Sequence, residues 1–208
     1  MYAVEAFREE RIEVLHALIA SFPLATLVLQ TPRGLEANHI PMLVDPHPAP
    51  FGTLLGHVAR ANPLWRNVDD STEILAVFQG SQGYITPSWY PSKKENGKVV
   101  PTWNYAVVHA HGPVLVHHDA QWLRALVTRL TDQNEAKREL PWQVKDAPAD
   151  YIDTMLKAIV GIEVPIRRLQ GKWKMSQNRL PDDRAGVIQG LEARNTALDN
   201  AMLDAMRK

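Results

Sequence analysis

A cluster of basic side chains lies near the C-terminal end of the sequence, between Pro165 and Leu180, with no acidic residue among them. It consists of Arg167, Arg168, Lys172, Lys174 and Arg179. The 208-residue chain is balanced overall, with 23 basic and 23 acidic side chains, so this excess is local. Clustered cations bind phosphate, on a small ligand or on nucleic acid, although a solvated charged face is the alternative. Cations that face a cleft would indicate a ligand, and cations spread over an outer surface would indicate nucleic acid.

A second candidate site is the segment from Gly56 to Pro63, where a strand is predicted to end and a helical turn to begin. Free backbone N–H groups are expected at such a junction, and Arg60 lies among them, which suits a phosphate group. The alternative is a helix start that is capped by Asn62 and leaves Arg60 in solvent.

Polar residues also interrupt the strand predicted from Leu35 to Val44. Asn38 and His39 stand in its middle, where polar side chains need partners. Pro41 indicates an edge or a bulge, whose exposed main-chain groups can meet a ligand. An ordinary edge strand is the alternative.

Aromatic, hydroxyl and amide side chains are concentrated in two segments, Tyr84–Pro91 and Val100–Tyr105. Such groups suit a flat heterocycle that must be stacked and hydrogen-bonded. A core or a subunit interface is the alternative, because both are rich in tryptophan and tyrosine. The two interpretations agree if a ligand lies at a dimer interface.

Several other classes of chemistry are excluded or disfavoured by the sequence. The absence of cysteine excludes disulfides, thiolate metal sites and cysteine catalysis. His109 and His111 could share one strand face, but no acidic residue joins them nearby, so a metal site is not expected. No dinucleotide fingerprint, P-loop or nucleophile elbow is present. Any redox chemistry must therefore come from a bound cofactor.

The elements that position these residues are predicted from hydrophobic spacing and turn residues. Strands are expected at 24–30, 35–44, 52–58, 73–79, 99–118 and 162–169, with a turn at 80–83 and a bend at Gly112–Pro113. Helices are expected at 7–22, after Asp119 as a cap, after Asp146 as a second cap and, as a pair, over 182–207, with a helical turn within 60–68. Six or seven strands with hairpin-like connections predict an antiparallel β-barrel with flanking helices.

The domain organisation is predicted as one barrel domain, 1–180, followed by a C-terminal helical extension, 181–208. Charge interrupts the N-terminal segment where a signal peptide needs an apolar run, and no stretch is long and apolar enough for a membrane span. A cytoplasmic protein is therefore expected.

Four segments together resemble the PaiB family of FMN-binding negative transcriptional regulators. They are residues 56–63, 84–90, 100–105 and 171–179, and the resemblance extends from Met1 to about Leu191. It implies an antiparallel FMN-binding split barrel, similar to pyridoxamine 5′-phosphate oxidases. It also implies a homodimer with two flavin sites at the subunit interface.

The resemblance further implies which residues bind the flavin. Arg60 would pair with the phosphate, supported by Asn62, and His39 would line the ribityl or isoalloxazine part. The cluster around Trp103, contributed by either subunit, and the segment near Lys174 would complete the site. The implied set is His39, His57, Ala59, Arg60, Asn62, Thr102, Trp103, Asn104, Lys172, Lys174, Gln177 and Asn178, with no metal and with catalytic residues unassigned.

The resulting hypothesis is an FMN-binding dimer of the regulator family with a redox-sensing role. The alternatives are a flavin-dependent oxidoreductase of the pyridoxamine-phosphate-oxidase type, or a haem-binding split barrel in which His39, His57 or His109 ligates iron. A regulator that contacts DNA without flavin chemistry also stays open, although no helix-turn-helix pattern is recognisable. Whether the protein is an enzyme is left undecided.

Overall fold

The computed structural model describes residues 1–69 and 72–207 and divides the chain into two compact units. The first unit consists of Met1–Ser21, Gln79–His109 and Gln170–Lys208; the second consists of Phe22–Phe78 and Ala110–Leu169. None of the helices in the described ranges is long and apolar enough to cross a membrane.

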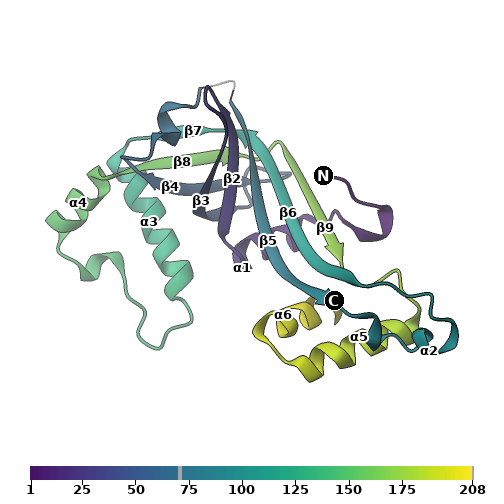
Figure 1. Ribbon diagram of the computed structural model, residues 1–208. Helices are drawn as coiled ribbons and strands as arrows, with labels where there is room; N and C mark the ends of the chain where they lie inside the picture. The colour runs from purple at the N-terminus through teal and green to yellow at the C-terminus, as the bar shows by residue number, and fades with distance from the viewer. Residues whose placement is uncertain (70–71, 208) are drawn as a thin grey trace. The chain divides into compact units, whose positions relative to one another are not determined.

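The second unit is built on antiparallel strands (Figure 1). β2 (Leu24–Thr31) and β3 (Gly34–Asp45) form a hairpin in which Thr26 faces His39. Gly34 has φ of 109°, which explains glycine at the turn. β4 (Thr53–Ala59) pairs with β3 and with β8 (Ile159–Pro165), which also pairs with β7 (Leu115–His117). Alternate side chains form the core, among them Leu27, Leu29, Ile40, Met42, Leu54, Val58, Val160 and Ile162.

Two helices of the second unit form a small separate core. They are α3 (Ala120–Glu135) and α4 (Ala149–Lys157), joined by a segment that contains η4 (Val144–Asp146). The buried residues of this core are Leu123, Val144, Ile152 and Leu156. The predicted cap of α3 is confirmed, because Asp119 Oδ1 accepts the Trp122 N–H at 2.7 Å.

The first unit contains the N-terminal elements, the outer strands and the C-terminal helices. In chain order these are η1 (Glu5–Phe7), β1 (Arg8–Glu9), α1 (Ile12–Ser21), η3 (Pro87–Trp89), α2 (Ser92–Asn96), α5 (Pro181–Arg194) and α6 (Ala197–Arg207). Strands β5 (Glu73–Ile85), β6 (Thr102–Pro113) and β9 (Arg168–Lys174) each run from one unit into the other. The expected pair of C-terminal helices is confirmed, and Lys208 lies outside the described residues.

The antiparallel fold is confirmed, but the number of strands was underestimated. The described residues form nine strands in the order β1-β9-β6-β5-β2-β3-β4-β8-β7. β1 and β7 span only two and three residues, too few to leave a pattern in the sequence. The predicted bend near Gly112–Pro113 corresponds to the gap between β6 and β7.

Three further predictions were wrong. The turn predicted at 80–83 does not exist, because β5 continues to Ile85; a Cβ on Gly80 would lie 3.0 Å from Leu18, so this glycine permits close packing. The strand predicted at 162–169 is two strands, β8 and β9. Asp146 does not cap α4, since it accepts the Gln143 N–H at 2.8 Å and closes η4.

The remaining differences are smaller. The N-terminal helix begins at Ile12 instead of residue 7, because residues 5–9 form η1 and β1. The helical turn expected within 60–68 is the single 3-10 turn η2 (Pro63–Arg66).

Candidate functional site

The first group of predicted site residues lies in the first unit, around a small pocket of about 40 Å³ that we call the Lys174 pocket. It is lined by Thr102, Asn104, Lys174, Ser176, Asn178 and Arg179. Thr102 and Asn104 are two residues apart on β6, so their side chains lie on the same face of that strand. The structure therefore brings four residues of the predicted set to one place: Thr102, Asn104, Lys174 and Asn178.

The Lys174 pocket is electropositive. Lys174 Nζ donates to the Trp103 carbonyl at 2.6 Å and to Thr102 Oγ1. Burial lowers the pKa of Lys174, and repulsion from Arg179 and Lys172 lowers it further. No carboxylate is among the groups that shift the pKa of Lys174, so its positive charge is not neutralised by them. A bound anion would supply the neutralising charge.

The floor of the Lys174 pocket is fixed by a reciprocal pair of hydrogen bonds. Asn104 Nδ2 donates to Ser176 Oγ at 3.0 Å, and Ser176 Oγ donates to Asn104 Oδ1 at 3.1 Å. Asn104 is 1% exposed and Ser176 is 3% exposed. Ser176 has φ of 61°, a left-handed conformation uncommon for a residue with a Cβ. Such conformations persist where the surrounding structure requires them, often at ligand sites.

The other predicted residues of the first unit lie around the pocket without lining it. Trp103 is 53% exposed and alternates with the pocket-facing residues of β6, so its side chain lies on the opposite face of the strand. Lys172 Nζ lies 5.2 Å from the ring centre of Tyr105. Gln177 Oε1 accepts the Met175 N–H at 2.6 Å, which braces the loop that carries Ser176.

The second group of predicted residues lies in the second unit. His57 and Ala59 lie on the same face of β4, opposite Gly161 and Ile159 of β8. The pairing of Met42 with Gly56 puts His39 on this face too, because both His39 and His57 lie an odd number of residues from that pair. The structure thus gives these three residues one shared sheet face.

His57 carries an unsatisfied polar atom. Its Nδ1 is buried and has no hydrogen-bond partner among the residues that the structure describes. Burial lowers the pKa of His57, so the neutral imidazole is favoured. A buried polar atom without a partner is costly, and a ligand group that bonded to it would remove that cost.

Arg60 is engaged with the protein itself. Its Nε donates to the Lys157 carbonyl at 2.6 Å, and its Nη2 donates to the Ile159 carbonyl at 2.8 Å. Its backbone N–H also donates, to the Ala158 carbonyl at 2.7 Å. Arg60 therefore braces the end of α4, and its predicted pairing with phosphate stays a prediction.

Asn62 closes the turn as the alternative interpretation of this segment expected. Its Oδ1 accepts the Leu64 N–H at 2.9 Å, and its Nδ2 donates to Asn38 Oδ1 at 2.9 Å. The N–H groups of Leu64 and Arg60, which were expected to be free, are therefore both engaged.

Other residues of the basic cluster and of the histidine set contact one another or a carboxylate. Arg168 Nη2 contacts His111 Nδ1 at 3.0 Å, and His117 Nε2 contacts Glu163 Oε2 at 2.6 Å. Within residues 1–69 and 72–207, no group of three or more metal-binding side chains could hold an ion.

Two residues of the Lys174 pocket were missed in the sequence-derived site, Ser176 and Arg179. Both stand in the segment 171–179 that carries the family resemblance, and Arg179 belongs to the basic cluster. The Arg179 guanidinium lies 4.9 Å from the ring centre of Tyr90, and its backbone N–H donates to the Ser176 carbonyl at 3.1 Å. The charge of this residue was the signal that could have identified it.

Comparison with solved structures identifies the fold class. The flavocytochrome Anf3 of Azotobacter vinelandii matches with a TM-score of 0.59 at 12% identity, over 84% of this chain and 72% of that chain. An FAD and heme binding protein of Mycobacterium smegmatis matches with a TM-score of 0.56 at 19% identity, over 80% of this chain and 72% of that chain. The chain has the split-barrel fold found among flavin-binding proteins.

Comparison of sequences identifies the family. The family model described as "Putative FMN-binding domain" matches residues 1–168. A relative from Emericella nidulans, described as uncharacterized, is 34% identical over 100% of this chain and 97% of its own length. The protease synthase and sporulation protein PAI 2 of Bacillus subtilis is 29% identical over 92% of this chain and 89% of its own. The chain belongs to this FMN-binding domain family, which confirms the PaiB-type resemblance and supports FMN as the cofactor.

The residues of the Lys174 pocket fit the phosphate end of an FMN molecule. The pocket offers cations and hydrogen-bond donors in a space that admits a phosphate-sized group and no ring system. In the second unit, the unsatisfied Nδ1 of His57 separately offers a hydrogen-bonding atom to a polar ligand group.

Proposed function

We propose that this protein binds FMN by its phosphate in the Lys174 pocket. The observation that carries the proposal is a pocket lined by two cations, Lys174 and Arg179, together with the hydrogen-bonding side chains of Ser176 and Asn178. Burial and the neighbouring cations lower the pKa of Lys174, which agrees with a site that lacks an anion. Such a site favours an anion, and a phosphate monoester is the anionic end of FMN. When bound, FMN supplies the redox chemistry that a chain without thiols lacks.

The chain's own residues would hold the cofactor. Lys174 and Arg179 would neutralise the phosphate, and Ser176 and Asn178 would orient it. Gln177 would keep the loop in place through its bond to Met175. In the second unit His39, His57 and Ala59 share one sheet face, and their predicted role in flavin binding stays a prediction. Arg60 is a second candidate for the phosphate, as the sequence predicts.

A comparison of FMN with riboflavin, which lacks the phosphate, tests the proposal. Lys174→Gln should weaken FMN binding about tenfold or more, since a charge-assisted hydrogen bond contributes about 1.5–3 kcal/mol. The same variant should leave riboflavin affinity unchanged, as measured by quenching of flavin fluorescence. Lys98→Gln removes an exposed lysine of the first unit outside the pocket and is the control.

The outcomes are distinct. Loss of both ligands to the same degree would mean that Lys174 acts through the fold, and no loss would remove it from the site. Arg60→Met, measured in the same way, decides between the two phosphate candidates. A loss of FMN alone in that variant would move the phosphate to Arg60.

The positions of the basic residues support a ligand over nucleic acid. Lys174 and Arg179 line a pocket, and Lys172 lies over aromatic rings. A cluster used for DNA would instead present its cations along an exposed face. We propose no direct DNA contact, and binding to promoter fragments with a steep dependence on salt would contradict this.

The proposal includes a homodimer and a cytoplasmic location, both expected from the sequence. Light scattering coupled to gel filtration measures the dimer directly. A protein that stays monomeric at micromolar concentration with FMN bound would contradict it.

A further inference from the structure

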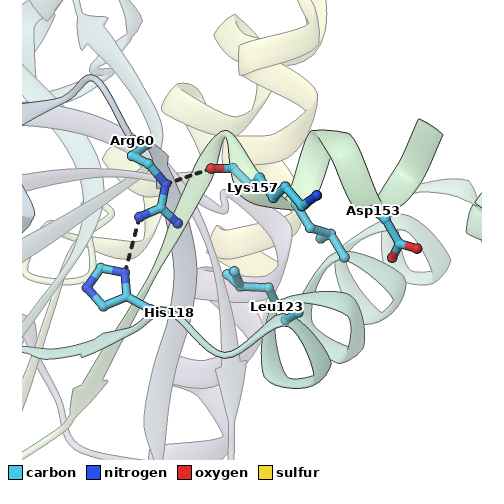
Figure 2. A pocket seen from close by; sticks show the side chains of 7 residues that line it. Arg60, His118, Leu123, Asp153 and Lys157 are labelled. Atoms are coloured by element: carbon cyan, nitrogen blue, oxygen red, sulfur yellow. Dashed lines mark hydrogen bonds between the residues drawn. The ribbon is translucent and has the colours of Figure 1, made fainter. Parts of the chain in front are cut away.

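A cavity of about 580 Å³ lies in the second unit, between α3, α4 and the end of β4 (Figure 2). Its polar lining comes from Arg60, His118, Asp153 and Lys157, and its apolar lining includes Leu123 and Leu156. This volume lies within the range of about 300–1,000 Å³ typical of small-molecule sites. The size alone suits a ligand of modest dimensions.

The charge of the cavity lining favours an anion. Arg60 and Lys157 are cations, and Asp153 is the carboxylate in the lining. Asp153 is already paired, because Arg124 Nη2 donates to its Oδ1 at 2.6 Å. The positive charges of Arg60 and Lys157 are therefore not balanced by a free carboxylate in the lining.

Arg60 is fixed by hydrogen bonds to the protein and still has unused N–H donors. Figure 2 shows its guanidinium between the Lys157 carbonyl and the His118 ring, with Nη1 at 3.4 Å from His118 Nδ1. A guanidinium carries five N–H groups. The bonds to Lys157, Ile159 and His118 use three of them, one on each nitrogen, which leaves one N–H on each terminal nitrogen. Two N–H groups on neighbouring nitrogens match the two oxygens of a carboxylate.

The apolar side of the cavity requires a ligand with an apolar body. Leu123 and Leu156 belong to the small core between α3 and α4. Ala120, the first residue of α3, also lines the cavity and leaves room because its side chain is a single methyl group. Burial of an apolar ligand surface against these side chains would lower the free energy, because that surface would be removed from water.

We propose that this cavity binds a small organic carboxylate with a compact apolar or aromatic body, as a second ligand distinct from FMN. The carboxylate would accept from the two remaining N–H groups of Arg60 and from Lys157 Nζ. The body would lie against Leu123 and Leu156. This proposal is independent of the Lys174 pocket, since every residue it uses belongs to the second unit.

Calorimetric titration of the full-length protein with 3-phenylpropionate tests the proposal. We expect 3-phenylpropionate to bind, and 3-phenylpropanamide, acetate and inorganic phosphate each to bind at least tenfold more weakly. The amide lacks the charge, and the two small anions lack the body. No heat of binding with 3-phenylpropionate at millimolar concentration, or equal binding of acid and amide, would overturn the proposal.

A matched pair of variants locates the site. Ala120→Phe fills the cavity and should weaken 3-phenylpropionate binding at least tenfold. Ala125→Phe places the same side chain at an exposed position of α3 outside the cavity and should change the affinity less than twofold. Equal losses in both variants would overturn the assignment. Lys157→Gln, on an exposed side chain, should weaken binding at least threefold and serves if Ala120→Phe does not fold.

Titration of FMN in the presence of 3-phenylpropionate separates the two ligands. We expect FMN affinity to change less than twofold, because the ligands occupy different sites. Competition between them would assign the cavity to the flavin site and overturn the proposal. A protein that binds no FMN would still give the calorimetric result, so the two proposals fail separately.

Discussion

The Asp199 carboxylate, in the first turn of α6, is surrounded by hydrogen-bond donors. It accepts from Arg194 Nε at 2.9 Å, from the Thr196 N–H at 3.1 Å and from Thr196 Oγ1 at 2.7 Å. Its side chain is 1% exposed. These bonds, led by the one from Arg194, lower the pKa of Asp199 from 3.8 to about 2. The ionised carboxylate therefore stabilises the folded state.

The magnitude follows from the pKa. Each unit of pKa corresponds to about 1.4 kcal/mol, so ionised Asp199 contributes about 2 kcal/mol at pH 7. Because the folded-state pKa is lowered, this contribution is present above about pH 4 and is lost as the pH falls toward 2. At pH 3 roughly half of it remains.

Asp199→Asn is expected to lower the free energy of unfolding by about 2 kcal/mol at pH 7 and by about 1 kcal/mol at pH 3. Urea unfolding followed by tryptophan fluorescence measures both values. Asp204→Asn replaces an exposed carboxylate of the same helix and should cost less than about 0.5 kcal/mol. The reasoning fails if Asp199→Asn costs the same at both pH values, or no more than the control.

Three further predictions concern other parts of the fold. Gly161→Ala would place a Cβ 2.2 Å from Trp122 Cζ3 and should cost about 1–3 kcal/mol in urea unfolding, with recovery when Trp122→Leu is added. The His57 ring should titrate below pH 6.5 by NMR, because burial lowers its pKa. The free energy of unfolding should therefore fall as the pH drops below 6.5, and titration of the ring above 6.5 would contradict this. Asn104→Ala should lower the free energy of unfolding by about 1–3 kcal/mol, because it leaves the buried Ser176 hydroxyl without its partner. Adding Ser176→Ala should lower the free energy of unfolding little further, and additive losses would show that the two residues are not coupled.

The fold was predictable wherever local signals were strong. The β2–β3 hairpin has a turn glycine and alternating apolar residues, and α3 has an aspartate cap. Glycine was misleading in β5, since Gly80 looks like a turn residue but serves close packing against Leu18, far away in the sequence. Pairings between distant segments leave no local trace, which is why β1 was missed and β9 was not separated from β8.

The candidate site was predictable in its residue types and less so in its geometry. The sequence identified Lys174 and Asn104 as members of one site, and the structure places them around one pocket. It could not reveal that Arg60 braces the end of α4, because its acceptors lie 97 and 99 positions away in the sequence. Nor could it reveal which of the five clustered cations face inward.

The way the chain passes between the two units has a consequence for synthesis. The first unit combines the beginning, the middle and the end of the chain, and β1 pairs with β9, where Arg8 faces Lys172. During translation β1 must therefore wait until β9 has emerged before it meets its partner strand. Such long loops slow folding and leave apolar surface exposed in the meantime. Leu15 of α1, fully buried in the native state, lies against Gly171 of β9 and is one of the apolar side chains that this delay leaves without a native contact.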